Sequence, residues 1–138
     1  MAQLPVPASV LPATTLLGLA QRGVSESAHT SAPGERYAQA HLAALRAAAA
    51  VLSCRATPTT EPSRTRPRSA WVLLAQVAPE LTEWAQFFAA GARKRAAAEA
   101  GLGGVVTSRE ADDLLRDVQA FLSVVETTLV GQLPAAVG

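Results

Sequence analysis

The chain has 138 residues, of which 49% are hydrophobic and 17% are charged, and this is enough to bury the core of one domain. Aromatic residues make up only 4%, so the core must consist mainly of Ala, Leu and Val, which favours closely packed helices over a β-sandwich. The net charge of +1 does not by itself indicate nucleic acid or an anionic membrane as a partner.

Cysteine content and apolar runs give the expected compartment. A single cysteine, Cys54, and the absence of any Cys/His cluster favour a reducing compartment and argue against zinc, and Cys54 is expected to be a small buried residue. The first 23 residues include an apolar stretch without the preceding Lys or Arg of a secretory signal. We expect a cytoplasmic protein with no cofactor, no metal and no membrane segment.

The first half of the chain predicts two helices. One is expected over residues 12–27, because apolar residues recur there at helical spacing. A stronger helix is expected over residues 34–55, where two apolar stripes lie side by side. One stripe, with Leu45 at its centre, is Ala38, Leu42, Leu45, Ala49 and Leu52, and the other is Tyr37, His41, Ala44, Ala48 and Val51. His41 is therefore expected at the border of the buried face.

The middle of the chain predicts a loop and then a divided helix. Residues 56–68 contain three prolines and several Thr and Ser, which predicts a flexible loop, and residues 1–10 are expected to be a flexible tail. Pro79 predicts a break in the following helix. That helix has an apolar stripe of Trp71, Leu74, Val77, Leu81, Trp84 and Phe88. The basic cluster 93–95 is expected near its C-terminal end, with Gly101, Gly103 and Gly104 ending it.

The last helix has a clear start signal, because Thr107 and Glu110 form the pattern of a capping box. Its apolar face, with Leu122 near the centre, is Leu114, Leu115, Val118, Phe121, Leu122, Val125 and Leu129. Opposite charges stand four residues apart on its exposed side, Arg109 with Asp113 and Asp112 with Arg116, and we expect a solvated helix face there. The sequence shows no strand pattern. It predicts a single all-α domain over residues 1–138, an antiparallel bundle of four helices, or five if Pro79 divides the third.

This order of elements resembles the HEPN superfamily, and within it the short single-domain actinobacterial members. The segments that carry the likeness are PGERYAQAHLAALRAAAAVL (33–52), RSAWVLLAQVAPELTEWAQFFAAGARKRAAAEAG (68–101) and TSREADDLLRDVQAFL (107–122). The resemblance implies a helical bundle that often dimerises and that is common in toxin–antitoxin and defence systems. In active members it implies a metal-independent endoribonuclease that uses an arginine and a histidine spaced R-x4-6-H.

Arg36 and His41 fit that spacing and are the candidate catalytic residues. The histidine would exchange a proton with the ribose 2′-hydroxyl or the leaving oxygen, and the arginine would hold the phosphate. On a helix, however, five residues correspond to about 7.5 Å of rise and about 140° of rotation, so the two side chains do not share a face. Arg22 and His29 match the spacing equally well. The alternative is structural, with His41 half-buried and Arg36 paired with a surface carboxylate.

Two basic clusters are candidate nucleic-acid contacts, since arginines can neutralise phosphates; their alternative is a solvated surface. They are Arg64, Arg66 and Arg68 in the loop, and Arg93, Lys94 and Arg95. Three functions follow. The preferred one is a HEPN-like interaction module that forms a homodimer, with RNA or a protein such as a nucleotidyltransferase-like antitoxin as further partners. The alternatives are a toxin-type endoribonuclease and a nucleic-acid-binding accessory protein.

Overall fold

The structure is a computed structural model that describes residues 12–55, 69–101 and 104–132. The helices are α1 (Ala13–Ala28), α2 (Pro33–Arg55), α3 (Ala70–Val77), α4 (Thr82–Ala90), α5 (Ala92–Glu99) and α6 (Ser108–Gln132), with a 3-10 turn, η1 (Pro79–Leu81), between α3 and α4. No strand occurs in these residues, which confirms the all-α prediction. The predicted tail 1–10 and loop 56–68 lie outside the described residues, as do Arg64, Arg66 and Arg68.

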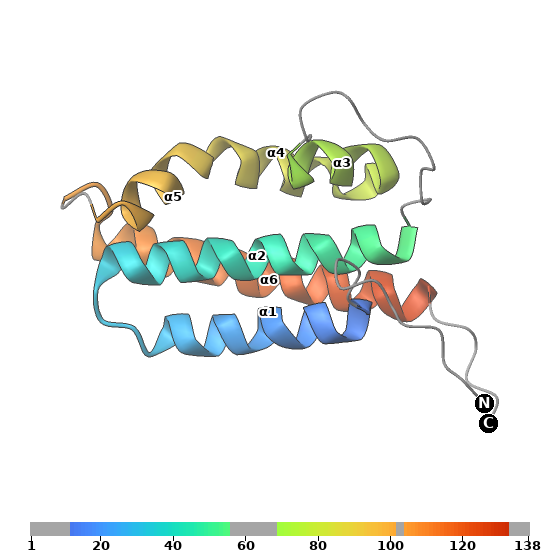
Figure 1. Cartoon of the computed structure of the whole chain (residues 1–138), viewed down its shortest axis with the longest axis horizontal. Helices are drawn as coiled ribbons and strands as arrows, with labels where there is room; N and C mark the ends of the chain where they lie inside the picture. Colours follow the sequence, from blue (N-terminus) through green and yellow to red (C-terminus); the bar gives the residue numbers. More distant parts are fainter. Residues whose placement is uncertain (1–11, 56–68, 102–103, 133–138) are drawn as a thin grey trace, which may run out of the picture.

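In Figure 1, α1 lies along one side of α2, the series α3, α4 and α5 lies along the other side, and α6 runs behind α2. The long helices α1, α2 and α6 pack against one another, and the shorter α3, α4 and α5 follow in series on the side of α2 away from α1. Along the chain, α1, α2, the series α3 to α5, and α6 run in alternating directions, as expected for an antiparallel bundle. The series α3, η1, α4 and α5 takes the place of the third helix of a simple four-helix bundle.

This series of helices is divided at two places. The break expected at Pro79 is confirmed, since α3 ends at Val77 and η1 begins at Pro79. A second break, which the sequence analysis missed, falls at Gly91, whose N–H bonds to the carbonyl of Phe88 at 3.1 Å. The basic cluster 93–95 consequently lies in the first turn of α5. The prediction that it lies at the C-terminal end of a helix was wrong, because a glycine begins a new helix just before it.

Helix α2 is the centre of the core, and its alanines allow neighbouring helices to approach closely. A Cβ atom placed on Gly23 of α1 would come within 3.2 Å of the Cβ of Ala43, so α1 and α2 are in close contact there. Of the two predicted stripes of α2, the one with Tyr37, His41 and Val51 is buried. The other, with Leu45 at its centre, is only partly buried. Leu45 was predicted at the centre of a core-facing stripe, but it is only partly buried. The neighbouring helices cover α2 mainly at its alanine positions instead.

A cluster of aromatic rings fills the space between α3 and α4 on one side and α6 on the other. The ring of Phe88 lies 5.0 Å from those of Trp71 and Phe121, and Trp84 lies 5.4 Å from Phe121. Phe88 and Phe121 are fully buried, and Trp71 is 4% exposed. Because these rings are large, α4 stands off from α6, and shallow cavities open along its flanks.

Cys54, expected to be buried, is exposed in the last turn of α2, next to Ser53, which is also exposed.

The start of α6 confirms the predicted capping box. The N–H of Glu110 donates to Oγ1 of Thr107, and the N–H of Thr107 donates to Oε1 of Glu110, both at 3.1 Å. The predicted apolar face is also confirmed; every residue of it is buried except Leu115, which is partly buried. The solvated face expected at Arg109, Asp112, Asp113 and Arg116 is confirmed, since all four are exposed, and neither i,i+4 combination forms an ion pair. Asp112 pairs with Arg36 of α2 instead, and Arg116 contacts Asp113 at 3.5 Å.

Replacing Thr107 with Ala should lower the free energy of unfolding by about 1 kcal/mol, because the Glu110 N–H loses its side-chain acceptor at the helix terminus. Urea denaturation monitored by circular dichroism measures this. The exposed neighbour Ser108 is the matched control, and Ser108→Ala should change the stability by less than about 0.5 kcal/mol. Equal effects at the two positions would mean that the capping box does not stabilise α6.

Candidate functional site

Arg36 lies in the first turns of α2, where its side chain holds the α1–α2 turn against α6. Its Nε donates to the carbonyl of Thr30 at 2.9 Å and its Nη2 to that of Ser31 at 3.1 Å. Its Nη1 forms an ion pair with Asp112. The side chain is only 15% exposed. The guanidinium group therefore makes contacts along three of its nitrogens, all of them to this chain, and the arginine serves as a structural tie between three helices.

His41, five residues later, is buried and faces α3 and α4. It is 1% exposed, and its Nε2 lies 3.0 Å from the carbonyl oxygen of Phe88. A carbonyl can only accept a hydrogen bond, so Nε2 carries the proton and donates it. The rings of Trp71 and Phe88 meet the imidazole edge to face, with centroids 5.9 Å away. The side chain expected to be half-buried is thus enclosed in the aromatic cluster.

The same environment determines the charge of His41. Burial lowers its pKa below the usual 6.5, and this outweighs the carbonyl of Phe88, which favours the protonated ring. The imidazole is therefore neutral at neutral pH. In this tautomer Nδ1 is the only acceptor, and it is buried without a hydrogen-bond partner among the described residues. His41 thus holds α2 to α4 through one nitrogen while the other is sealed in the core.

The structure does not bring Arg36 and His41 together. Arg36 reaches Asp112 of α6 and the α1–α2 turn, whereas His41 reaches Phe88 of α4. This agrees with the rotation of about 140° that separates the two positions on a helix. In the other pair with this spacing, His29 is exposed at the end of α1 with its Nδ1 2.8 Å from the carbonyl of Ser25, and Nη1 of Arg22 lies 3.9 Å from a Cβ atom placed on Gly18, on the side of Arg22 away from His29. Within one chain, neither pair forms a joint site for a phosphate.

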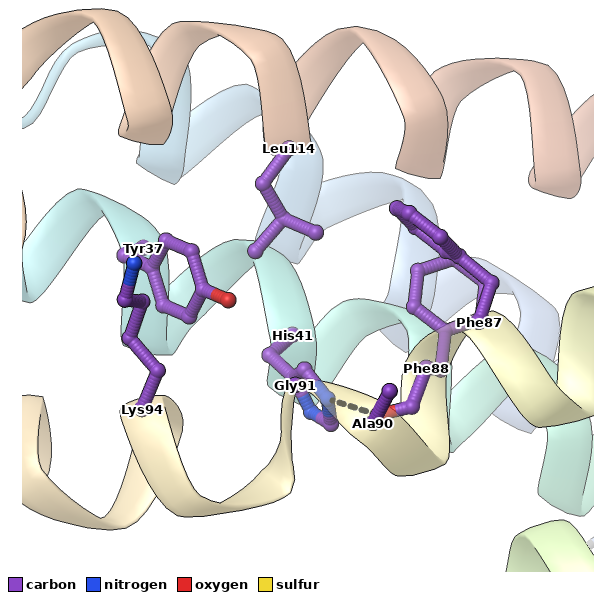
Figure 2. A pocket seen from close by; sticks show the side chains of 8 residues that line it. All are labelled: Tyr37, His41, Phe87, Phe88, Ala90, Gly91, Lys94 and Leu114. Atoms are coloured by element: carbon purple, nitrogen blue, oxygen red, sulfur yellow. Dashed lines mark hydrogen bonds between the residues drawn. The ribbon is translucent and has the colours of Figure 1, made fainter.

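A cavity of about 290 Å³ lies beside His41, between α2, α4, α5 and α6 (Figure 2). Figure 2 shows Tyr37 and Lys94 at one end, Phe87 at the other and His41 between them. The remaining lining residues are Phe88, Ala90, Gly91 and Leu114. Gly91 leaves room for Tyr37, because a Cβ atom at this position would come 3.1 Å from the hydroxyl oxygen of Tyr37, closer than an ordinary van der Waals contact.

The ionisable groups of this cavity do not form an acid–base pair. Burial raises the pKa of Tyr37 above 10.0, and the ion pair with Glu110 raises the pKa of Lys94 and lowers that of the glutamate. The phenol is therefore protonated, the lysine charged and the histidine neutral at neutral pH. What remains is a small, largely apolar cavity with polar groups at one end.

The basic cluster at the start of α5 is largely neutralised by nearby carboxylates. Lys94 pairs with Glu110, and Arg95 contacts Glu99 at 3.0 Å. Arg93 is exposed and takes part in none of the ion pairs found in residues 12–55, 69–101 and 104–132. One free cation is a weak phosphate-binding surface, since affinity for nucleic acid grows with the number of phosphates neutralised.

The part of the chain that the structure describes contains neither a cluster of metal-ligating side chains nor a helix that could span a membrane. No group of three or more His, Cys, Asp or Glu side chains is placed there to hold a metal ion. No helix there is long and apolar enough to cross a membrane. The partners of the candidate residues, Asp112 and the Phe88 carbonyl, were not predicted, because neither is close to them in the sequence.

Comparison with known proteins gives the family. The model of the SAV_6107-like HEPN family matches residues 27–126, which run from the end of α1 into α6 and include Arg36 and His41. No curated protein and no solved structure matches the chain. The family match covers more than two thirds of the chain, agrees with the helical architecture and confirms the resemblance seen in the sequence. The chain therefore belongs to the SAV_6107-like HEPN family.

Proposed function

We propose that this chain is a HEPN module that acts by binding other proteins and does not cleave RNA. The observation that supports this most directly is the separate engagement of Arg36 and His41. Each side chain joins helices of its own chain, Arg36 to α6 and His41 to α4. Both residues therefore have structural roles that account for their presence without catalysis.

The chemistry of RNA cleavage supports the proposal. A general base must have an acceptor nitrogen within about 2.6–3.2 Å of the ribose 2′-hydroxyl. Nδ1 of His41 is the acceptor in the tautomer that the Phe88 carbonyl imposes, and it is buried in the core. Freeing Nε2 instead would break the contact that joins α2 to α4. An RNA strand thus reaches neither nitrogen unless α4 moves away.

The charge distribution favours a protein partner over nucleic acid. Two of the three cations in the 93–95 cluster are paired with carboxylates, whereas apolar side chains, Val72 and Phe87, are about half exposed on α3 and α4. Exposed apolar groups beside cavities are typical of protein interaction surfaces. The row formed by α3, α4 and α5 is therefore the surface on which we expect a partner.

The purified protein should leave single-stranded RNA intact in EDTA, and so should His41→Ala. His29→Ala is the matched control, because it removes the exposed histidine without disturbing the core. Gel analysis of a labelled RNA over several hours measures the cleavage. Cleavage by the wild type that yields a cyclic phosphate, and that His41→Ala reduces by about 10²-fold or more while His29→Ala does not, would show that the chain is an endoribonuclease.

A further inference from the structure

Tyr37 is a buried residue whose hydroxyl group has no hydrogen-bond partner in the described part of the chain. The residue is 7% exposed, and its hydroxyl takes part in no hydrogen bond within residues 12–55, 69–101 and 104–132. Figure 2 shows this hydroxyl directed toward the middle of the cavity beside His41. Buried polar groups almost always have a hydrogen-bond partner, because an unsatisfied one loses its hydration without compensation. An occupant of the cavity is therefore the group that can supply one.

Gly91 leaves the space around this hydroxyl open. A Cβ atom at position 91 would come 3.1 Å from the hydroxyl oxygen of Tyr37 and 3.8 Å from Cδ2 of His41. The backbone of Gly91 has φ −85° and ψ −2°, which other residues also adopt, so the backbone alone does not require a glycine here. The small size of this residue instead gives the cavity room beside the Tyr37 hydroxyl.

The polar end of the cavity offers hydrogen-bond donors. Burial raises the pKa of Tyr37, so its phenol is protonated at neutral pH and can donate. Lys94, whose charge also acts on this phenol, has three N–H donors, of which the ion pair with Glu110 occupies only part. His41 turns its Cδ2 edge toward this end, while its unpartnered Nδ1 is sealed in the core. The ligand group that best matches this end is therefore an acceptor.

The charges around the polar end cancel one another. Lys94 is paired with Glu110, and the imidazole of His41 is neutral because burial lowers its pKa. A carboxylate bound here would lose its hydration and would compete with Glu110 for the same ammonium group. A carbonyl oxygen accepts hydrogen bonds without bringing a second negative charge. The polar end therefore favours an uncharged ligand over an anion.

The rest of the cavity is apolar and suits a single ring. Its walls there are Phe87, Phe88, Ala90 and Leu114. The volume is about 290 Å³, whereas a cavity of about 150 Å³ is enough to hold benzene. One aromatic ring with a short substituent therefore fits, and contacts between this ring and the phenyl groups of α4 would add to the affinity. Such a ligand would also cover Phe87, which is 47% exposed.

We propose that the cavity beside His41 binds a small uncharged aromatic molecule that carries one carbonyl group. The carbonyl oxygen accepts a hydrogen bond from the hydroxyl of Tyr37, and the ring lies against Phe87 and Leu114. This inference goes beyond the proposed function, because it assigns a class of ligand to a site within the chain and requires neither RNA nor a protein partner.

Acetophenone is the probe, and two-dimensional NMR of the isotope-labelled full chain measures its binding. We expect saturable shifts of the amide signals of Tyr37, Gly91 and Lys94, with a Kd of about 0.1–1 mM for a ligand of this size. Tyr37→Phe should weaken the binding of acetophenone by about 5-fold, because one hydrogen bond is lost. Ethylbenzene, which has the same ring and two-carbon substituent without the oxygen, should bind the wild type and Tyr37→Phe equally. That result would also show that the cavity of the variant is intact.

Two controls test the position of the site and its preference for an uncharged ligand. Val72→Ser alters the cavity of about 320 Å³ between α3 and α4 and should leave the binding of acetophenone unchanged. Benzoate should bind at least about 10-fold more weakly than acetophenone, because it is charged. Shifts that do not saturate below about 5 mM acetophenone, equal affinity of the wild type and Tyr37→Phe, a loss of binding in Val72→Ser, or benzoate binding as tight as that of acetophenone would each overturn the inference. None of these results depends on RNA cleavage, which tests the module function separately.

Discussion

Phe121→Ala is expected to lower the free energy of unfolding by about 3–5 kcal/mol, one of the largest effects of any single substitution in this chain. Phe121 is fully buried, and its ring lies 5.0 Å from that of Phe88, 5.4 Å from that of Trp84 and 6.2 Å from that of Trp71. Removing it leaves a cavity between α6 and the row that includes α3 and α4. Alanine-rich neighbouring surfaces have few flexible side chains with which to fill it.

Leu45→Ala is the control for this experiment, because Leu45 is only partly buried on α2. Its loss should be less than half of that for Phe121→Ala, whereas Leu122→Ala, at a position 5% exposed, should cost about 2–5 kcal/mol. Urea denaturation with unchanged m-values gives all three numbers. A Leu45→Ala variant as destabilised as Phe121→Ala would mean that the core lies on the other side of α2.

Local sequence signals predicted the parts of the fold that depend on local chemistry. The capping box of Thr107 and Glu110 and the break at Pro79 both follow from the hydrogen-bonding capacity of neighbouring residues, and both occur. The buried face of α6 also follows, because its large apolar residues contrast with the charged ones between them.

The buried face of α2 could not be predicted in the same way. Alanines occupy most positions around this helix, and an alanine gives little contrast between a buried and an exposed side. The leucines then seemed to mark the core, yet Leu45 is partly exposed while Ala43, Ala44 and Ala47 are fully buried. Which side of α2 is buried was decided by where neighbouring helices approach its small side chains closely. This depends on the sequences of those helices and not on that of α2 alone.

The candidate site shows a similar division. The spacing of Arg36 and His41 was enough to predict that they face different directions, and the structure agrees. Their partners could not be predicted, because Asp112 lies 76 residues from Arg36 and the acceptor of His41 is a main-chain carbonyl, which every residue has. The exposure of Phe87 follows from the period, since Phe88 continues the stripe of Trp84 and Phe87 does not. The cavities beside it depend on how far the aromatic cluster separates α4 from α6.

His41→Gln is expected to remove a pH dependence of stability that the wild type has. Burial lowers the pKa of His41 in the folded protein below the usual 6.5, so the unfolded chain binds more protons in the interval between the two values. The contribution of the neutral imidazole is therefore complete above about pH 6.5 and is lost as the pH falls towards the folded value. One proton gives a slope of at most about 1.4 kcal/mol per pH unit.

Glutamine is the informative replacement, because its amide can still donate to the Phe88 carbonyl but does not titrate. Urea denaturation of both proteins between about pH 5 and pH 8 gives the difference in unfolding free energy, in which the carboxylates and His29 cancel. The charged groups that influence His41 most, Arg95 and Glu99, pair with each other and act in opposite directions on its pKa, so burial determines the sign. The wild type should lose stability relative to His41→Gln as the pH falls. A constant difference, or a relative gain at low pH, would show that the imidazole is not held neutral in the core.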